Sequence, residues 1–270
     1  TIFIFSYPPT MNLIAIFTKK ILRKKTIYSI WELYPEIAQK LNELNSNLLL
    51  KSFKTVDNFC LKTIDEIVVN SNELKQYLIK NRGINDNKIS VIYHFANESE
   101  SPPSEIIKNE IMYAGNLGTP QNLESFLNLF SESSNKYQIT IFGGGSQYEK
   151  ISGFESEKIN VNPFVSRDLL VELTKDIPFA LVSLSPNITV EGFPGKTFDY
   201  LKMNKILIGY SNPESSLANF IEKYNLGINI SPNDVELDSK LKIFDDKKNI
   251  EQIYKNITKI NNEFANVDAV

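Results

Sequence analysis

Short hydrophobic runs alternate with amphipathic stretches along most of the chain. In the first part, runs rich in Ile, Val and Phe predict buried strands at 1–6, 26–30, 65–71 and 88–94. Between them, apolar residues recur at helical spacing and predict helices at 10–25, 35–44, 48–64 and 71–81. Strands that alternate with helices are typical of right-handed βαβ units and a parallel sheet.

A second alternation of the same kind begins near residue 110. Its hydrophobic runs predict strands at 111–114, 138–142, 159–162, 178–184, 205–209 and 226–230. Its helical patterns lie at 121–132, 147–151, 167–174, 195–203, 214–224 and 248–264. The intervening stretch 99–109 is rich in Ser, Pro and Glu and is predicted to be a linker. The sequence therefore predicts an α/β protein with Rossmann-like domains at 1–98 and 110–247 and a C-terminal helical segment at 248–270, with ligands at the carboxyl ends of the strands.

The composition excludes several classes of function. The net charge is −3, whereas nucleic-acid binders are usually basic, so no nucleic-acid partner is expected. The single cysteine, Cys60, allows no internal disulfide and fits a reducing compartment. The single histidine, His94, argues against His-rich metal sites and Ser/His/Asp catalysis, so acid–base work falls to carboxylates, Lys or Tyr. No apolar run reaches the roughly 18 residues of a transmembrane helix.

The stretch "VEGFPGKTFDYLKM" combines features of an anion site. Pro194 suits the first turn of a helix, and Gly195 allows a ligand to approach the backbone. Lys196 adds a positive charge to the free N–H groups of that turn, and Asp199 shares its helix face. Glu191 lies just before the helix, so carboxylates suited to sugar hydroxyls flank a phosphate cradle. The alternative is an ordinary helix start with an exposed Lys–Asp pair.

Other strand ends carry glycine-rich or aromatic loops that could contact a nucleotide. The run "YAGNLGTPQNLE" places Gly115 and Gly118 around a turn after a strand, with Pro120 predicted to start the helix, but it is not a G-x-G-x-x-G fingerprint. Gly143 and Gly144 end another strand, and the backbone near Phe164 and Val165 could meet a planar base. Each of these segments could equally be an ordinary turn or packing.

An aromatic and acidic cluster follows the second strand. The segment "SIWELYPE" places Trp31, the only tryptophan, beside Glu32 and Tyr34 at a strand end. Such a cluster suits a sugar-binding cleft on the acceptor side, although aromatic clusters more often belong to a core.

Taken together and in order, these motifs resemble the family 4 glycosyltransferases, retaining enzymes of the GT-B fold. In particular, "YAGNLGTPQNLE", "PGKTFDY" and "WELYPE" resemble motifs of the bacterial branch that builds surface polysaccharides, of the N-acetylfucosamine transferase type. The resemblance covers nearly all of residues 1–260. It implies transfer of a sugar from a nucleotide diphosphosugar, with a UDP-sugar as the favoured donor, to a glycan or lipid-linked acceptor with retention, as in lipopolysaccharide synthesis.

The resemblance also assigns roles to residues. Glu191 and Asp199 match the two acidic positions of the family's E-x7-E signature, with Asp199 on the ribose hydroxyls and Glu191 near the donor sugar. Glu191 and Lys196 are then the catalytic candidates, and Trp31 and Glu32 lie on the acceptor side. The donor nucleotide is assigned to Asp199, Gly195, Pro194, Gly115, Asn116, Gly118, Gln121, Gly143, Gly144, Phe164 and Val165. Because Asn116 and Gln121 are neutral where many family members carry cations, Lys196 is left as the only obvious cation for two phosphates. No metal or cofactor is expected.

Three further expectations follow. The family normally has a strand, a glycine-rich loop and further βα units before the segment that matches residue 1, so we expect an incomplete N-terminal domain and a weakly active or inactive fragment. Lys19, Lys20, Arg23, Lys24 and Lys25 end an amphipathic helix, which suggests either peripheral contact with the inner face of the cytoplasmic membrane or a solvated helix end in a cytoplasmic protein. A degenerate sugar-nucleotide-binding partner subunit is the alternative function, and a sugar-nucleotide 2-epimerase is disfavoured by the single histidine.

Overall fold

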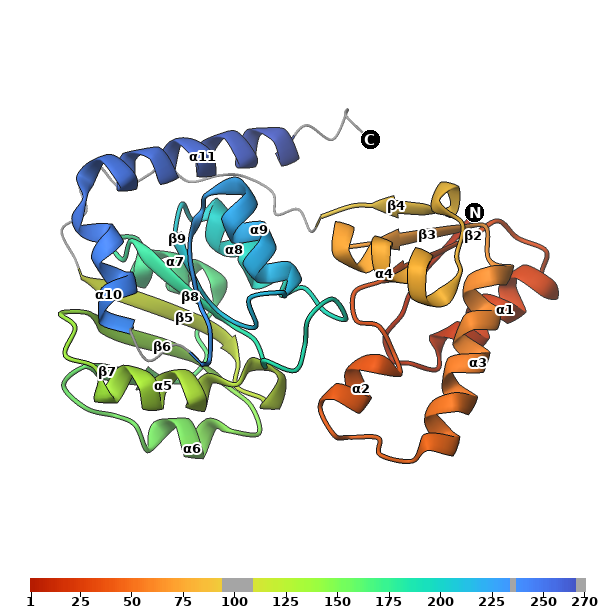
Figure 1. Cartoon of the computed structure of the whole chain (residues 1–270), viewed down its shortest axis with the longest axis horizontal. Coiled ribbons are helices and arrows are strands. Elements are labelled where there is room, and N and C mark those ends of the chain that lie inside the picture. The colour runs from red at the N-terminus through yellow and green to blue at the C-terminus, as the bar shows by residue number, and fades with distance from the viewer. Residues whose placement is uncertain (94–108, 234–236, 266–270) are drawn as a thin grey trace. The chain divides into compact units, whose positions relative to one another are not determined.

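The computed structural model describes residues 1–93, 109–233 and 237–265 and divides into two compact units. Unit 1 comprises Thr1–His94 and Asn187–Phe193, and unit 2 comprises Phe95–Pro186 and Pro194–Val270. The sequence analysis had assigned the segment Asn187–Phe193 to the second domain, whereas it packs in unit 1. Apart from residue 109, the predicted linker lies outside the described residues. Each unit contains one parallel sheet with helices packed on it (Figure 1).

Unit 1 is built on a four-stranded parallel sheet in the order β1-β2-β3-β4. Its strands are β1 (Ile2–Phe5), β2 (Thr26–Ile30), β3 (Glu66–Val69) and β4 (Ile89–Val91), and its helices are α1 (Met11–Lys20), α2 (Glu36–Lys40), α3 (Asn47–Thr63) and α4 (Asn72–Arg82). Ser71 caps the start of α4, since its hydroxyl accepts a hydrogen bond from the Leu74 N–H at 3.1 Å. Gly83 ends α4 with a φ of 64°, a conformation that favours glycine.

A buried ion network joins the helices of unit 1. Arg82, at the end of α4, donates two hydrogen bonds to the Glu36 carboxylate, at 2.9 and 2.7 Å. Its guanidinium also lies 3.3 Å from Asp57 of α3. The Arg82 side chain is fully buried, so these carboxylates replace the hydration that it loses. Burial raises the pKa of Asp57 to about 6, against the opposing effect of Arg82.

Unit 2 is built on a six-stranded parallel sheet in the order β10-β9-β8-β5-β6-β7. Its strands are β5 (Glu110–Asn116), β6 (Gln138–Gly144), β7 (Ile159–Asn162), β8 (Phe179–Ser183), β9 (Ile206–Tyr210) and β10 (Gly227–Ile230). Its helices are α5 (Leu123–Glu132), α6 (Tyr148–Ser152), α7 (Arg167–Thr174), α8 (Lys196–Lys202), α9 (Ser216–Tyr224), α10 (Leu237–Leu241) and α11 (Lys247–Ala265). The strand order reverses direction between β5 and β8. In open parallel sheets, ligands bind outside the carboxyl ends of the strands at such a switch point.

The central strands of unit 2 are hydrophobic along their whole length because both faces of the sheet are covered. All five residues of β8 and all five residues of β9 are buried. Aromatic side chains complete the core, with Phe126 packed edge-on against Tyr210 at 5.3 Å between ring centroids. This packing fixes the strand ends and their loops.

Two differences from the predicted elements bear on function. The helix predicted at 10–25 ends at Lys20, so residues 21–25 and their three cations lie beyond α1. The predicted helix at 121–132 begins only at Leu123, because Thr119–Gln121 forms a separate 3-10 turn and Asn122 has a φ of 47°. Pro120 therefore lies in that turn and does not start α5. No helix in the described residues is both long enough and apolar enough to cross a bilayer.

Candidate functional site

Lys196 is the first residue of α8, and its ammonium is buried with no hydrogen-bond partner in the described part of the chain. Its Nζ lies 3.7 Å from the centroid of the Tyr113 ring. Gly115 leaves the space for this ammonium, since a Cβ there would lie 3.1 Å from Nζ. The ring face replaces only part of the lost hydration, and burial lowers the pKa of Lys196 to about 7. A buried ammonium with no carboxylate partner is suited to receive an anion.

Tyr200 fixes the helix that carries Lys196. It lies four residues after Lys196 on α8, so both side chains share one helix face. The Tyr200 hydroxyl accepts a hydrogen bond from the Ala114 N–H at 2.7 Å and donates one to the Ala114 carbonyl at 3.0 Å. The neighbouring Tyr113 hydroxyl donates to the Asn116 carbonyl at 2.7 Å. These bonds hold the ammonium against the carboxyl end of β5.

The N-terminus of α8 contributes less positive charge to the site than the sequence suggested. Helix α8 has seven residues and begins after Pro194 and Gly195, not at Pro194. Gly195 has a φ of −59°, which any residue can adopt, so its backbone conformation does not require glycine. A helix of two turns has few aligned peptide dipoles, so the positive charge at this position comes chiefly from Lys196.

The loop after β5 is held by its own side chains. The Gly118 N–H donates to the Gln121 side-chain oxygen at 3.0 Å, so the oxygen of the Gln121 amide stabilises the turn. The Asn116 amide lies against Gly118, where a Cβ would approach its nitrogen to 3.1 Å. Asn116, Gly118 and Gln121 thus form one packed turn beside Gly115. Their predicted contacts with a nucleotide remain predictions.

Gly143 and Gly144 end β6, Gly145 follows it, and together they allow neighbouring segments to approach one another. A Cβ on Gly143 would lie 2.3 Å from the Gly115 carbonyl oxygen, which only glycine permits. Gly145 has a φ of 138°, also typical of glycine. Gly144 lies against the Phe164 ring, since its Cβ would be 3.0 Å from the ring carbons. Because Phe164 is 60% exposed, one face of its ring can stack on a planar base.

Asp199 pairs with a cation that the sequence analysis missed. Arg167 begins α7 and lies 3.3 Å from the Asp199 carboxylate, and both side chains are partly exposed. Arg167 is thus a second cation near α8, whereas the expectation that Lys196 alone serves the two phosphates stays a prediction. The signal in the sequence was the position of Arg167, directly after the Ser166 cap and close to Val165 in the loop that follows β7. Val165 itself is half-buried.

Glu191 lies in unit 1, where its carboxylate already has partners. It is 2% exposed and accepts hydrogen bonds from the backbone N–H groups of Thr189 and Val190, at 3.0 and 3.1 Å. Lys40 of α2 lies 3.2 Å from the same carboxylate. The Glu191 carbonyl accepts a hydrogen bond from the Leu33 N–H at 2.8 Å. The sequence analysis foresaw none of these partners, and the proposed contact of Glu191 with a donor sugar remains a prediction.

Trp31 and Glu32 follow β2 at the carboxyl edge of the unit 1 sheet. Trp31 is 42% exposed and packs edge-on against Phe5, with the ring centroids 5.8 Å apart. Its indole N–H donates to the Ser29 hydroxyl at 3.2 Å. Glu32 is solvent-accessible, yet partial burial of the carboxyl and the nearby Glu43 raise its pKa. An exposed indole beside a carboxylate is compatible with the predicted acceptor side.

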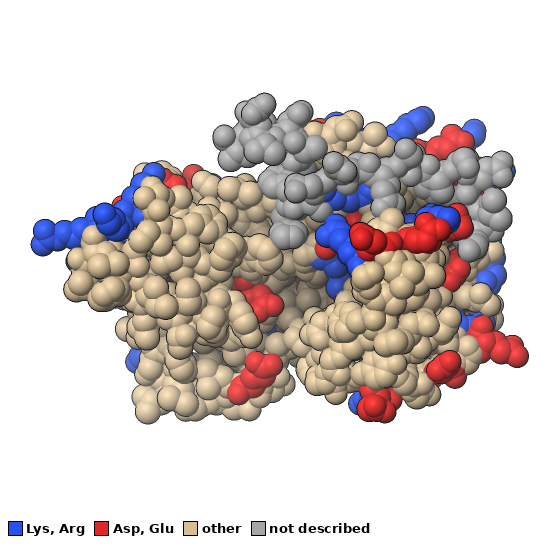
Figure 2. All heavy atoms as spheres, turned by 180° about the vertical axis from the view of Figure 1, so that it is seen from behind, with Lys and Arg blue, Asp and Glu red and all other residues tan. Residues whose placement is uncertain are grey.

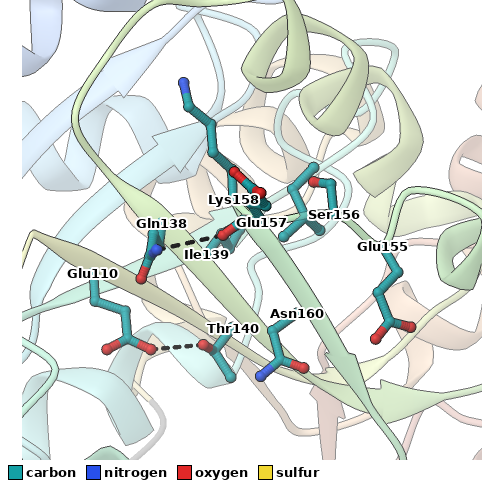
Figure 3. A pocket seen from close by; sticks show the side chains of 10 residues that line it. Glu110, Gln138, Ile139, Thr140, Glu155, Ser156, Glu157, Lys158 and Asn160 are labelled. Carbon is teal, nitrogen blue, oxygen red and sulfur yellow. Dashed lines mark hydrogen bonds between the residues drawn. The ribbon is translucent and has the colours of Figure 1, made fainter.

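A separate pocket lies at the opposite end of the unit 2 sheet. It has a volume of about 300 Å³ and is formed by the first residues of β5, β6 and β7 (Figure 3). Within it, the Thr140 hydroxyl donates to Glu110 at 2.6 Å, and the Gln138 amide donates to the Glu157 carbonyl at 3.3 Å. Because these residues lie at the amino ends of the strands, the pocket is not the site around Lys196.

Comparisons with known proteins show which fold the chain has. The chain matches no protein-family model and no curated protein. Among solved structures, it resembles a sucrose-phosphate synthase from Thermosynechococcus elongatus with a TM-score of 0.74 and 13% identity, over 96% of this chain and 68% of that one. It resembles Anabaena HepE in complex with UDP and glucose with a TM-score of 0.74 and 11% identity, over 98% and 74%. It resembles the lipopolysaccharide outer core galactosyltransferase WaaB with a TM-score of 0.65 and 16% identity, over 95% and 69%.

At these identities the likeness shows the fold alone. The predicted class, an α/β protein of the GT-B fold with two Rossmann-like parallel-sheet units, is confirmed. The closer resemblance to family 4 and to N-acetylfucosamine transferases stays a prediction.

Proposed function

We propose that the protein is a glycosyltransferase that moves a sugar from a nucleotide diphosphosugar, most simply a UDP-sugar, to a glycan or lipid-linked acceptor. The observation that carries the proposal is the buried ammonium of Lys196 at the switch point of the unit 2 sheet, where the residues that the structure describes give it no hydrogen-bond partner. Fold neighbours give support, since HepE has been seen with UDP and with UDP-glucose, and WaaB is a galactosyltransferase of the lipopolysaccharide outer core. We propose a comparable role in cell-envelope polysaccharide synthesis.

On this proposal, the residues of unit 2 have distinct tasks. Lys196 binds the diphosphate and stabilises the negative charge that grows on it as the bond to the sugar breaks. Asp199, held by Arg167, accepts hydrogen bonds from the ribose hydroxyls. The exposed ring of Phe164 stacks on the base.

We further propose that the anomeric configuration is retained by a front-face route. In that route, the departing phosphate oxygen assists removal of the proton from the acceptor hydroxyl. Glu191 then positions the donor sugar, and Trp31 and Glu32 contact the acceptor. We propose no metal ion, because the ammonium of Lys196 supplies the positive charge beside the phosphates. The buried, unpaired thiol of Cys60 fits action in the cytoplasm.

Titration calorimetry with UDP, UMP and GDP tests this proposal. We expect UDP to bind more tightly than UMP by roughly tenfold or more, because one charge-assisted contact to the second phosphate is worth about 1.5–3 kcal/mol. Lys196→Ala should reduce UDP binding to the level of UMP. If none of the three nucleotides binds, or UMP and UDP bind equally, the diphosphate role of Lys196 is wrong.

One observation favours the alternative of a non-catalytic sugar-nucleotide-binding subunit. The Glu191 carboxylate is buried and already holds Lys40 and two backbone N–H groups, so its free capacity for a sugar is small. Release of UDP from UDP-sugars, followed by ³¹P NMR with and without glycan acceptors, separates the two. Tight UDP binding with no release from any donor would support the binding subunit.

A further inference from the structure

Helices α1 and α3 lie side by side in unit 1 (Figure 1). Large apolar side chains on these helices and directly after α1 are exposed. Ten such residues, eight on the two helices and two directly after α1, are each between 37% and 75% exposed: Leu13, Ile14, Phe17, Ile21, Leu22, Leu48, Leu49, Phe53, Val56 and Phe59. We call them the α1–α3 surface. The Lys20 ammonium lies 5.9 Å from the centroid of the Phe59 ring and links the two helices. Exposed apolar residues gathered on neighbouring helices, unlike single ones, indicate a binding surface.

The chain segment that contributes α1 and the residues after it to this surface carries only positive charges. Residues 11–25 contain five cations and no acid, although the chain has a net charge of −3. Lys19 and Lys25 pair with Asp65 and Glu66, at 2.5 and 2.7 Å. The remaining cations of this stretch, Lys20, Arg23 and Lys24, are exposed. Lys and Arg side chains project from one end of unit 1, at the left of Figure 2.

Helix α3 continues this charge pattern. It carries three lysines and a single acid, Asp57, which is buried against Arg82 and absent from the surface. The hydroxyl groups of its small polar residues donate to backbone carbonyls of the same helix. The Ser52 hydroxyl donates to the Leu48 carbonyl at 2.9 Å, and the Thr55 hydroxyl donates to the Lys51 carbonyl at 2.7 Å. The surface therefore offers few directional hydrogen-bonding groups that would fix the orientation of a protein partner.

We propose that the α1–α3 surface docks on a lipid bilayer that contains anionic headgroups. The apolar side chains enter the boundary between headgroups and acyl chains, while the surrounding Lys and Arg reach the lipid phosphates. This is the arrangement of an interfacial amphipathic helix, here formed by two packed helices. Each cation near an anionic membrane strengthens binding by roughly fivefold. The proposal does not depend on glycosyl transfer, since the surface lies in unit 1 and contains none of the proposed donor residues.

Flotation with lipid vesicles tests it. We expect the protein to float with vesicles of three parts phosphatidylcholine to one part phosphatidylglycerol, and to bind pure phosphatidylcholine at least tenfold more weakly. Arg23→Glu with Lys24→Glu should weaken binding to anionic vesicles by roughly 25-fold or more. The matched control, Lys247→Glu with Lys248→Glu on α11, makes the same change of charge at exposed positions of unit 2 and should leave binding within twofold.

A second pair of variants tests the apolar contribution. Phe17→Gln with Phe53→Gln removes two half-exposed rings and should weaken binding to anionic vesicles by tenfold or more. Leu169→Gln with Leu173→Gln on α7 is the control, since these leucines are equally exposed but lie in unit 2. Circular dichroism confirms that each variant folds, which is expected because all the substituted side chains are at least partly exposed.

The outcomes separate a membrane from other occupants. Loss of vesicle binding in both α1–α3 pairs but in neither control supports the proposal. Equal binding to neutral and anionic vesicles, or no binding at all, overturns it. So does a stable dimer in analytical ultracentrifugation that the Phe17→Gln, Phe53→Gln pair dissociates without any vesicle binding, because the surface is then an interface between copies of the chain.

Discussion

The ammonium of Lys196 lies over the face of the Tyr113 ring, 3.7 Å from the ring centroid, in a place where the described residues offer it no hydrogen-bond acceptor. The ring quadrupole attracts the cation, but it does not replace three hydrogen bonds to water. The unliganded protein therefore carries an electrostatic cost that a bound anion relieves. Several testable consequences concern the residues that surround this pair.

Replacing Lys196 by Met should stabilise the unliganded protein and abolish its response to UDP. Methionine fills a similar volume without a buried charge, so we expect the free energy of unfolding at pH 7 to rise by about 1 kcal/mol or more. Wild-type protein at 100 times the dissociation constant of UDP should gain about 2.7 kcal/mol, whereas the variant gains nothing. Thermal melts with and without UDP measure both effects.

Lys175→Met is the control, because the Lys175 side chain is exposed and pairs with Glu172 on the surface of α7. It should change neither the melting temperature nor the UDP response. An undiminished UDP shift in Lys196→Met would show that the nucleotide binds elsewhere.

UDP binding should weaken as the pH rises from 7 to 9. The pKa of Lys196 in the free protein is about 7, and a bound diphosphate raises it. Above pH 7 the lysine must therefore take up a proton on binding, and affinity falls by up to tenfold for each pH unit. Calorimetry in two buffers of different ionisation enthalpy measures the proton uptake, which should be near one at pH 8.5 and absent in Lys196→Met.

The low pKa of Lys196 gives the stability of the free protein a pH dependence opposite to that of UDP binding. The folded pKa lies below the unfolded value of 10.5, so the unfolded chain binds more protons between pH 7 and 10.5. Stability from this group therefore rises with pH across that window. Lys196→Met should remove this part of the pH dependence.

The sequence predicted the parallel strands well because their signals are local. The fully buried strands β8 and β9 appear in the sequence as mainly apolar runs, and serines, which are common helix caps, precede α4 and α7 at positions 71 and 166. The start of α5 was misplaced because Asn122 takes a left-handed conformation that separates the Pro120 turn from the helix.

The partners of site residues could not be predicted, because they depend on contacts between distant segments. Arg167 meets Asp199 across 32 residues, and Lys40 meets Glu191 across 151. Nothing in the periodicity of either segment encodes such a pairing. The burial of Lys196 also depends on Gly115 and Tyr113, which only the packing of α8 on β5 brings close.

Gly143→Ala should destabilise unit 2. Its Cβ would lie 2.3 Å from the Gly115 carbonyl oxygen, a backbone atom that cannot move without displacing β5. We expect a loss of about 1–3 kcal/mol, as for an overpacked core. Hydrogen exchange of the β5 and β6 amides measures it. Gly153→Ala is the control, since Gly153 has an ordinary φ of −64°, and its effect should stay within about 0.5 kcal/mol.

Arg82→Met should destabilise unit 1 by about 3–5 kcal/mol, because it leaves the Glu36 and Asp57 carboxylates buried without their cation. Trp31 is the only tryptophan and lies in unit 1, so its fluorescence in urea reports on this unit. The loss of unfolding free energy in Arg82→Met should be smaller at pH 5, where both carboxyl groups can take up protons. Lys54→Met removes a more exposed cation 3.3 Å from Glu36 and should cost under about 1 kcal/mol. Equal losses in the two variants would contradict the network.

Lys40→Met should loosen the segment Asn187–Phe193. Lys40 is 3.2 Å from the Glu191 carboxylate and donates to the Thr189 hydroxyl at 3.1 Å, so its loss removes the cation that faces a buried charge. Because the Lys40 side chain is about one-third exposed, we expect a cost of about 1 kcal/mol, or roughly fivefold faster hydrogen exchange of this segment and of the Leu33 amide.

Lys40→Arg keeps the charge and should restore most of the protection, whereas Lys54→Met, on the neighbouring helix α3, should leave this exchange unchanged. Mass spectrometry of peptides that cover the segment and Leu33 distinguishes these variants. Unchanged exchange in Lys40→Met would mean that the backbone bonds from Thr189, Val190 and Leu33 hold Glu191 by themselves. In that case Lys40 would be free to serve a ligand, and its variants should be assayed for binding.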